Sequence, residues 1–432
     1  MNPIRLSPEK PQRQLQALSS PQGNRDIYNS VSYCNRCGAC SQVCPSYQLH
    51  QQEVFSPRGR NQLLRLVLEG KIKLNSRDKL LTQTLLTCTL CGRCTQHCAG
   101  QIPTAEHVLE MRRALQMHVL PTLLYRFLNK RESSPHLFAF AARTALVLRQ
   151  LGVLKLVRAL QLTRLKTLSF LNHLNEILPA KTPSLKKGLQ QNELALDTPQ
   201  PQLIYLPSLE AQFVLPDIAC QTLKRAQRKF RTTVWTNTPS GLFSYVYGDL
   251  RQSRRVLRRL IRLHAKTAGG NLPLLTDSID VYLFLKRVPQ LFAGYKKWEI
   301  RAQKLTSCVR FVTDIFPPVK KAKTSSVVQL EQGALFKRQD PVFGQAQKIL
   351  YTLFGKNFVE CSYTDADVPA YGYVFVAPQE AAKIGLQAVE KLARTRTHQV
   401  VALSGLAVLE LNYLCKKFYP AAKATHFVDV DR

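Results

Sequence analysis

The stretch CNRCGACSQVCP, from Cys34 to Pro45, holds four cysteines at the spacing CxxCxxCxxxCP. A second stretch, CTLCGRCTQHCA from Cys88 to Ala99, repeats this spacing with alanine in place of the proline. Two residues between successive cysteines let a tight loop present three sulfurs to adjacent corners of one cubane, while the fourth cysteine lies on a following helical turn and points elsewhere. The pattern therefore predicts two 4Fe–4S clusters that pass electrons.

The spacing also predicts how the two runs share their ligands. In two-cluster ferredoxin arrangements the fourth cysteine of each run binds the cluster of the other run. The first cluster is then expected on Cys34, Cys37, Cys40 and Cys98. The second cluster is expected on Cys88, Cys91, Cys94 and Cys44. This crossing ties the runs together in space and places the clusters close enough for an electron to hop between them.

Zinc ribbons and disulfides also use paired CxxC motifs. Zinc sites close with four ligands from two CxxC pairs, whereas each run here holds four cysteines at ferredoxin spacing. Disulfides are disfavoured because the cytoplasm, where this chain is expected for the reasons given below, is a reducing compartment. Arg36, Arg93 and His97 lie inside or beside the runs, and their charge either stabilises the more reduced cluster state or belongs to a solvated surface.

The composition is that of a folded protein of several domains, with 45% hydrophobic and 21% charged residues in 432. Its weakly charged stretches fall short of the roughly 20 apolar residues that a membrane-spanning helix needs, and the N-terminus lacks a secretory signal. A cytoplasmic location is therefore expected. The 61 Lys plus Arg outnumber the 28 Asp plus Glu, and the charge of +33 favours nucleic acid, acidic proteins or anionic lipid without choosing among them.

The N-terminal half divides into three segments. Residues 1–26 are rich in Pro, Gln and Ser and are expected to be flexible. Residues 27–108 form the predicted double-cluster domain, in which helices over 60–67 and 78–86 favour an α-helical domain over the compact β-containing ferredoxin. Residues 109–183 are predicted to be basic and helical, with an apolar face that either lies on an anionic membrane surface or packs on its own domain.

After a polar linker, short apolar segments alternate with helical ones in two successive regions, 201–316 and 324–432. In the first region we expect strands at 203–206 and 272–276 and a helix at 217–230. In the second we expect strands at 327–330, 374–377 and 400–403 and a helix at 342–354. The predicted fold class is an α-helical two-cluster ferredoxin domain followed by two related α/β domains.

The two cysteine runs, the intervening SPRGRNQLLRLVLEG from Ser56 to Gly70 and the tandem α/β regions resemble the glycolate oxidase iron–sulfur subunit family. The resemblance covers most of the chain. It implies an electron-transfer subunit without a catalytic site of its own, beside a FAD-containing dehydrogenase subunit that oxidises glycolate or D-lactate. Quinone or another membrane acceptor would take the electrons, with the chain peripheral on the inner face of the cytoplasmic membrane. The chain lacks a GxGxxG fingerprint, which fits flavin held by a partner.

The chain departs from this family in its C-terminal halves, which usually each carry a CCG signature. The corresponding positions are Pro239–Gly241 in the first half and Val368–Ala370 in the second, and Glu331 and Gln332 stand where a Cys–His pair is common. Four single cysteines are expected to be small buried hydrophobes rather than ligands: Cys220, Cys308, Cys361 and Cys415. These degenerate CCG-like halves are therefore expected to act as a docking scaffold, and whether they keep a third redox centre stays open.

Other functions stay open at this point. The subunit could serve a D-lactate or glycerol-3-phosphate dehydrogenase, because the substrate contacts would lie on another chain. Structural clusters in a basic nucleic-acid-binding protein would account for the charge, but this reading is disfavoured because no helix-turn-helix, zinc-finger or RNP motif occurs. A paralogue that keeps its clusters for regulation or assembly would account for the missing CCG cysteines.

Overall fold

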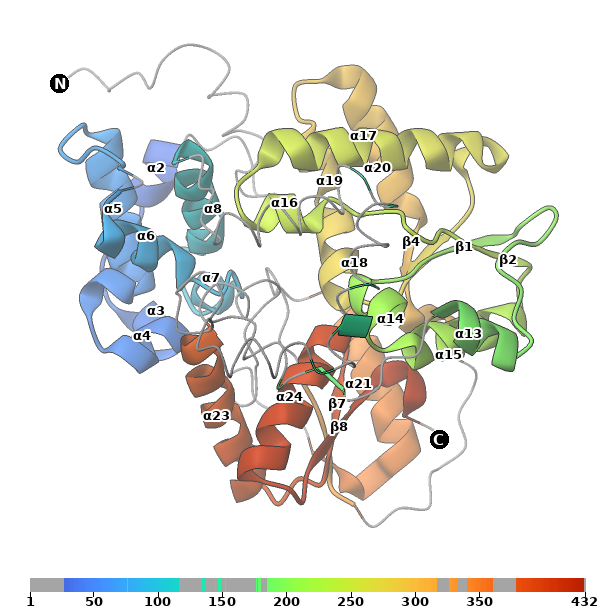
Figure 1. Ribbon diagram of the computed structural model, residues 1–432. Coiled ribbons are helices and arrows are strands. Elements are labelled where there is room, and N and C mark those ends of the chain that lie inside the picture. The colour runs from blue at the N-terminus through green and yellow to red at the C-terminus, as the bar shows by residue number, and fades with distance from the viewer. Residues whose placement is uncertain are drawn as a thin grey trace.

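The computed structural model describes residues 27–75, 77–115, 185–316, 326–331, 340–359 and 378–430, with isolated positions between 134 and 179. Figure 1 shows a helical N-terminal domain, drawn in blue, beside two α/β domains that follow it along the chain. This confirms the expected class of a helical domain followed by α/β domains. The segment expected to be flexible and most of the basic helical region lie outside the described residues. Within the described ranges, no helix is long and apolar enough to cross a membrane.

All regular elements described between residues 27 and 115 are helical. They are α2 (Ile27–Ser32), α3 (Ala39–Gln42), α4 (Pro45–His50), η1 (Glu53–Phe55), α5 (Pro57–Leu68), α6 (Lys79–Leu86), α7 (Arg93–Gln96) and α8 (Thr104–Ala114). The helices predicted between the cysteine runs are present as α5 and α6. Both begin at a capping side chain: Ser56 Oγ accepts a hydrogen bond from the Gly59 N–H at 2.8 Å, and Asp78 Oδ1 accepts one from the Leu81 N–H at 3.0 Å.

Helix α8 joins the N-terminal domain to the first α/β domain. Residue 108, after which a domain boundary was expected, lies inside α8, and the buried positions of this helix continue through Arg112. Near its start, Glu106 Oε1 accepts a hydrogen bond from Arg287 Nη2 at 2.8 Å in an almost fully buried ion pair. Near its end, a Cβ on Gly248 would lie 2.8 Å from the backbone nitrogen of Arg113, so this close approach requires glycine.

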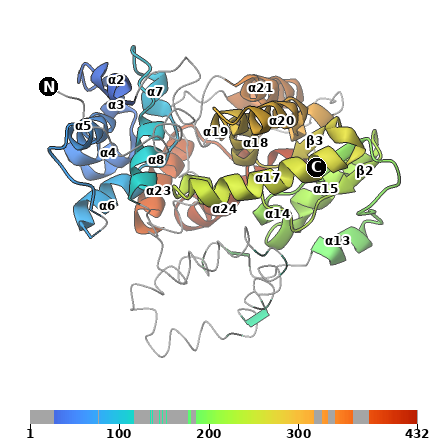
Figure 2. The same ribbon diagram turned by 90° about the horizontal axis from the view of Figure 1, so that it is seen from above.

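The first α/β domain is built on a parallel sheet with the strand order β2-β1-β3-β4. The strands are β1 (Leu203–Leu206), β2 (Thr232–Val234), β3 (Leu274–Thr276) and β4 (Val309–Phe311). The α-helices are α13 (Leu185–Gln191), α14 (Leu209–Phe213), α15 (Pro216–Gln227), α16 (Leu242–Val246), α17 (Leu250–Lys266), α18 (Ile279–Lys286), α19 (Val288–Leu291) and α20 (Lys296–Cys308). Figure 2 shows the long helix α17 lying across this domain.

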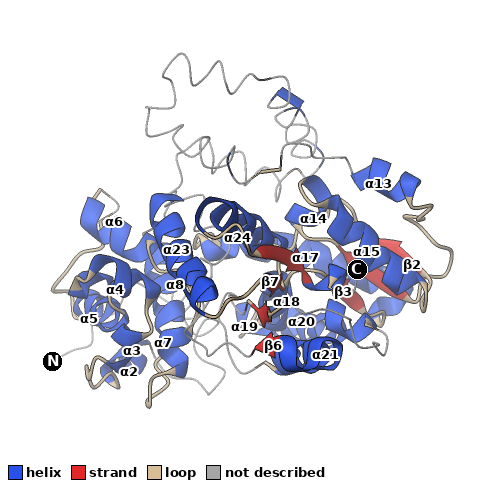
Figure 3. Cartoon of the chain, turned by 90° about the horizontal axis from the view of Figure 1, so that it is seen from below, coloured by secondary structure: helices blue, strands red, loops and turns tan. Residues whose placement is uncertain are grey.

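The second α/β domain repeats this topology, with a parallel sheet in the order β6-β5-β7-β8. The strands are β5 (Val328–Leu330), β6 (Phe358–Val359), β7 (Gln399–Ala402) and β8 (Lys423–His426). The α-helices are α21 (Pro341–Phe354), α23 (Pro378–Arg394) and α24 (Gly405–Phe418). Figure 3 shows the strands enclosed by helices, and α23 reaches the N-terminal domain, where it packs against α4. The strand expected at 374–377 lies outside the described residues.

A buried histidine connects three helices of the N-terminal domain. The Nδ1 atom of His107, in α8, lies 2.8 Å from Asn61 Oδ1, and its Nε2 atom lies 2.9 Å from Ser30 Oγ. Asn61 also donates from Nδ2 to Thr104 Oγ1 at 3.0 Å. Burial lowers the pKa of His107 from 6.5 to about 4, so the folded chain holds this imidazole neutral at pH 7.

We expect the stability of this chain to fall as the pH drops below about 6.5, because unfolding lets His107 and His426, whose pKa burial also lowers to about 4, take up protons. His107 serves as the probe of this effect. Its contribution is fully present above that pH and is lost progressively toward pH 4. Between pH 7.5 and 5.5 the loss amounts to about 1 kcal/mol. Urea unfolding at both pH values checks this, with His107→Gln expected to make the pH dependence shallower and His426 expected to account for part of what remains. Equal pH dependence in wild type and His107→Gln would refute this role.

Candidate metal centre

Both cysteine runs adopt the same backbone conformation around their second cysteine. The preceding residue, Arg36 in the first run and Leu90 in the second, has a φ of 55° in each case. The following residue is glycine, with a φ of 84° at Gly38 and 76° at Gly92, and each glycine begins a short helix, α3 or α7. Left-handed residues on both sides of a cysteine turn the chain sharply. The cysteine spacing therefore forms the same tight loop twice.

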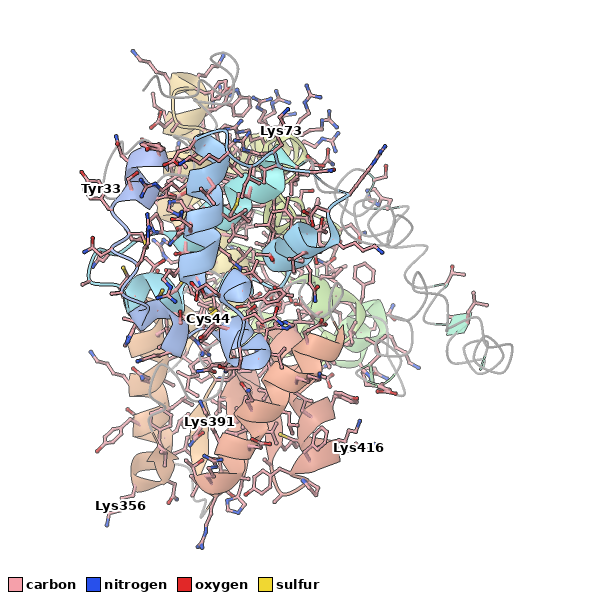
Figure 4. The ribbon with its side chains drawn as sticks, turned by 90° about the vertical axis from the view of Figure 1, so that its left-hand side faces the viewer. Tyr33, Cys44, Lys73, Lys356, Lys391 and Lys416 are labelled. Carbon is pink, nitrogen blue, oxygen red and sulfur yellow. The ribbon has the colours of Figure 1, made fainter. Side chains whose placement is uncertain are left out.

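Four thiols drawn from both runs line one cavity, and we call them the inner set: Cys44, Cys88, Cys91 and Cys94. Figure 4 shows Cys44 among the helices of the N-terminal domain. Burial raises the pKa of Cys44, although Arg60 acts in the opposite direction, and burial with neighbouring thiols raises the pKa of Cys94 well above its ordinary value. Such thiols ionise when bound iron supplies positive charge, so this donor set fits a cluster.

The other thiols gather around Cys40, and we call them the outer set: Cys34, Cys37, Cys40 and Cys98. Burial raises the pKa of Cys40 to about 11, a value to which the neighbouring thiols contribute. Cys44 is one of these neighbours, so the two sets lie next to each other. Cys37 is exposed whereas Cys44 is buried, which places the outer set nearer to solvent.

The four thiols that share one cavity are those expected to bind the second cluster, and the other four are those expected to bind the first. In the part of the chain that the structure describes, no three Cys, His, Asp or Glu side chains converge closely enough to hold a single metal ion. A cubane spreads its four thiolates around a core of iron and sulfide, so its ligands stand farther apart than those of one ion. The assignment of the eight ligands to two cubanes stays a prediction.

The PRGR motif between the runs contacts the first cysteine loop through a hydrogen bond. Arg58 Nη1 donates to the Arg36 carbonyl at 3.1 Å. The charge of Arg58 is matched by Glu53, whose two carboxylate oxygens lie 2.6 and 2.7 Å from Arg58 Nε and Nη2. A Cβ on Gly59 would lie 2.0 Å from the Glu53 carbonyl oxygen, so only glycine fits there. This packing gives a physical reason for the RG pair in the motif.

Sequence reasoning missed Arg60, whose side chain is buried beside the inner set. Its guanidinium donates to the Thr84 carbonyl at 2.9 Å, to Ser46 Oγ at 2.9 Å and to Thr87 Oγ1 at 3.2 Å. Nη1 lies 3.9 Å from Cys44 Sγ. The available signal was its position, since Arg60 lies on the core-facing side of α5 with Pro57, Asn61, Leu64 and Val67.

A second arginine that sequence reasoning missed, Arg112, forms hydrogen bonds with the backbone at the start of the second run. Its buried guanidinium donates to the Cys88 carbonyl at 2.9 Å and to the Leu85 carbonyl at 2.7 Å. It also donates to the Val246 carbonyl, in α16, at 2.9 Å. Arg112 therefore ties the inner set to the first α/β domain.

The remaining sequence candidates differ in burial. Arg36 and His97 are exposed, whereas Arg93 is buried. Of the single cysteines, Cys220 and Cys415 are buried as expected, and Cys308 is partly exposed. Cys361 lies outside the described residues, as do Val368–Ala370 and Gln332. In the first half, Gly241 begins α16 with a φ of 86°.

Comparison with known protein families bears directly on the cysteine runs. Residues 30–102, which include all eight of these cysteines, match the family described as a 4Fe–4S dicluster domain. We call this matching segment the dicluster domain. The dicluster domain holds the two loops, the inner and outer sets and the PRGR motif. Iron–sulfur clusters are thus the cofactors of this chain.

Three curated proteins resemble parts of the chain. The glycolate oxidase iron-sulfur subunit of Escherichia coli (strain K12) is 42% identical over 59 residues, 13% of this chain and 14% of that protein. The probable glycolate oxidase iron-sulfur subunit of Bacillus subtilis (strain 168) is 31% identical over 107 residues, 24% and 23% of the two chains. Lactate utilization protein B 1 of Bacillus mycoides (strain KBAB4) is 29% identical over 134 residues, 28% and 27%.

These matches span about a quarter or less of the relatives' length. No solved structure matches the chain. The likeness to named relatives is therefore local.

Proposed function

We propose that this chain is the iron–sulfur subunit of a glycolate oxidase-like 2-hydroxyacid dehydrogenase complex and passes electrons through two 4Fe–4S clusters. The observation that carries the proposal is the gathering of eight thiols into two adjacent sets within a dicluster domain. The resemblance to two glycolate oxidase iron-sulfur subunits supports the choice of complex. Bound clusters supply reversible one-electron transfer. The hydride chemistry belongs to a partner subunit that carries FAD.

The two sets have different places in this electron path. The outer set reaches the surface at Cys37, which suits exchange with a partner that docks there. The inner set lies deeper. Arg60 of the PRGR motif lies beside Cys44 Sγ, and Arg112 donates a hydrogen bond to the Cys88 carbonyl. Adjacent placement of the sets through Cys40 and Cys44 supports transfer between them.

The acceptor in this proposal is quinone or another membrane carrier, reached by a cytoplasmic chain that lies on the anionic inner membrane face. Helix α17 supports such an encounter because cations repeat along its exposed side: Arg251, Arg255, Arg259, Arg262 and Lys266. Figure 2 shows that α17 lies at the surface of the molecule. Each cation near an anionic bilayer contributes about 1 kcal/mol of attraction.

D-lactate is the second candidate substrate of the complex. One relative carries the name lactate utilization protein B, which favours this candidate over glycerol 3-phosphate. Glycolate and D-lactate are both 2-hydroxyacids, so the same electron-transfer subunit would serve a flavoprotein that oxidises either one.

The test is anaerobic purification of the full chain with its bound partners, followed by flavin absorbance and EPR before and after addition of substrate. Glycolate or D-lactate is expected to reduce the clusters through a co-purified flavoprotein, and glycerol 3-phosphate serves as the comparison substrate. Clusters that neither co-purify with flavin nor respond to any substrate would contradict the proposal. Binding to duplex DNA that weakens steeply with salt would then favour the nucleic-acid function.

A further inference from the structure

Arg60 places a positive charge inside the dicluster domain. Its side chain is 1% exposed. Three hydrogen-bond acceptors around it are neutral, because they are the Thr84 carbonyl and the hydroxyls of Ser46 and Thr87. Among the described residues, Arg60 forms no ion pair with a carboxylate. A guanidinium removed from water without an opposite charge is costly, so the surroundings of Arg60 call for an anion.

The remaining contact of Arg60 identifies where that anion lies. Nη1 lies 3.9 Å from Cys44 Sγ, and Arg60 lines the same cavity as the four inner thiols. Four thiolates around a cluster leave it negatively charged, and reduction adds a further negative charge. A fixed cation at the cavity wall therefore stabilises the reduced state more than the oxidised state.

We propose that Arg60 is the buried counter-charge of the inner cluster and raises its reduction potential above that of the same site with a neutral residue. The inference rests on the proposed binding of a cluster by the inner set. Arg58 provides the contrast two residues away, because its charge is already matched by Glu53. The two arginines of one motif thus divide their roles: Arg58 fastens the first loop, and Arg60 sets the potential of the inner cluster.

The test is an anaerobic EPR-monitored redox titration of the full chain in wild type, Arg60→Met, Arg60→Lys and Arg58→Met. Methionine keeps most of the length of arginine and removes its charge. Arg60→Met is expected to make reduction of the inner cluster about tenfold less favourable, which is about 59 mV for one electron. Arg60→Lys should retain most of the wild-type potential, and Arg58→Met should leave the inner-cluster potential unchanged.

The inner-cluster signal is identified independently of Arg60. It is the signal that Cys91→Ala removes and Cys37→Ala retains. A wild type without iron–sulfur clusters would contradict the proposed function itself. Clusters whose potentials are the same in wild type and Arg60→Met would overturn only the role of Arg60.

If Arg60→Met assembles no inner cluster, Arg60→Lys decides the outcome. An inner cluster retained by the lysine variant supports the counter-charge, because lysine keeps the charge without the planar fork. Loss of the inner cluster in both variants would mean that the guanidinium acts through its hydrogen bonds, which overturns the proposal.

Discussion

A chain carrying Cys98→Ala is expected to lose the cluster of the first cysteine run, although Cys98 belongs to the second run. The reason is that Cys98 lies among the thiols around Cys40. Cys44, from the first run, instead lines the cavity that contains the first three cysteines of the second run. Iron content should fall from about eight to about four per chain. The remaining EPR signal should match that of Cys37→Ala.

The reciprocal variant provides the matched control. Cys44→Ala should leave the same signal as Cys91→Ala, because both remove a ligand of the inner set. If Cys98→Ala instead gave the spectrum of Cys91→Ala, each run would bind its own cluster. The crossed assignment would then be wrong.

Arg287→Met is expected to lower the free energy of unfolding by about 3 to 5 kcal/mol, because it leaves Glu106 buried without its partner charge. The pair joins α8 to the first α/β domain, and its side chains are 9% and 4% exposed. Urea unfolding of the holoprotein measures the loss. The double variant Glu106→Gln with Arg287→Met should recover part of it, since no uncompensated charge remains.

A less buried ion pair of the same length provides the comparison. Arg65 Nε lies 2.8 Å from Glu69 Oε1, but the two side chains are 32% and 18% exposed. Arg65→Met should therefore cost much less than Arg287→Met, because water screens this pair and Lys71 still pairs with Glu69. Equal losses in Arg65→Met and Arg287→Met would show that burial does not govern the contribution of Arg287.

The sequence predicted those strands that lie fully inside the sheets. β1 and β3 are buried along their whole length and consist of apolar residues except for Thr276, and β1 has the expected bounds. β8 was not predicted, because its sequence KATH alternates exposed and buried positions at a sheet edge. The domain boundary expected after residue 108 stays a prediction. Helix α8 continues across that position, and its Arg112 is buried against backbone carbonyls, which the basic character of the segment did not indicate.

The candidate site was predictable to the extent that its chemistry is local in sequence. Cysteine spacing defines both loops, and left-handed residues at Gly38 and Gly92 follow from the same short motif. The environment of the thiols was not predictable, because it depends on tertiary contacts. Arg60 reaches Cys44 from a helix 16 residues farther along the chain, and Arg112 reaches Cys88 across 24 residues.

In the proposed function, the dicluster domain carries two redox-active clusters. The most direct measurement is iron, acid-labile sulfide and zinc content of the anaerobically purified full chain, together with EPR of the dithionite-reduced protein. We predict about eight iron and about eight sulfide per chain, and a spectrum broadened by two adjacent reduced clusters. Zinc in place of iron, or iron without sulfide, would show that the eight cysteines do not bind iron–sulfur clusters.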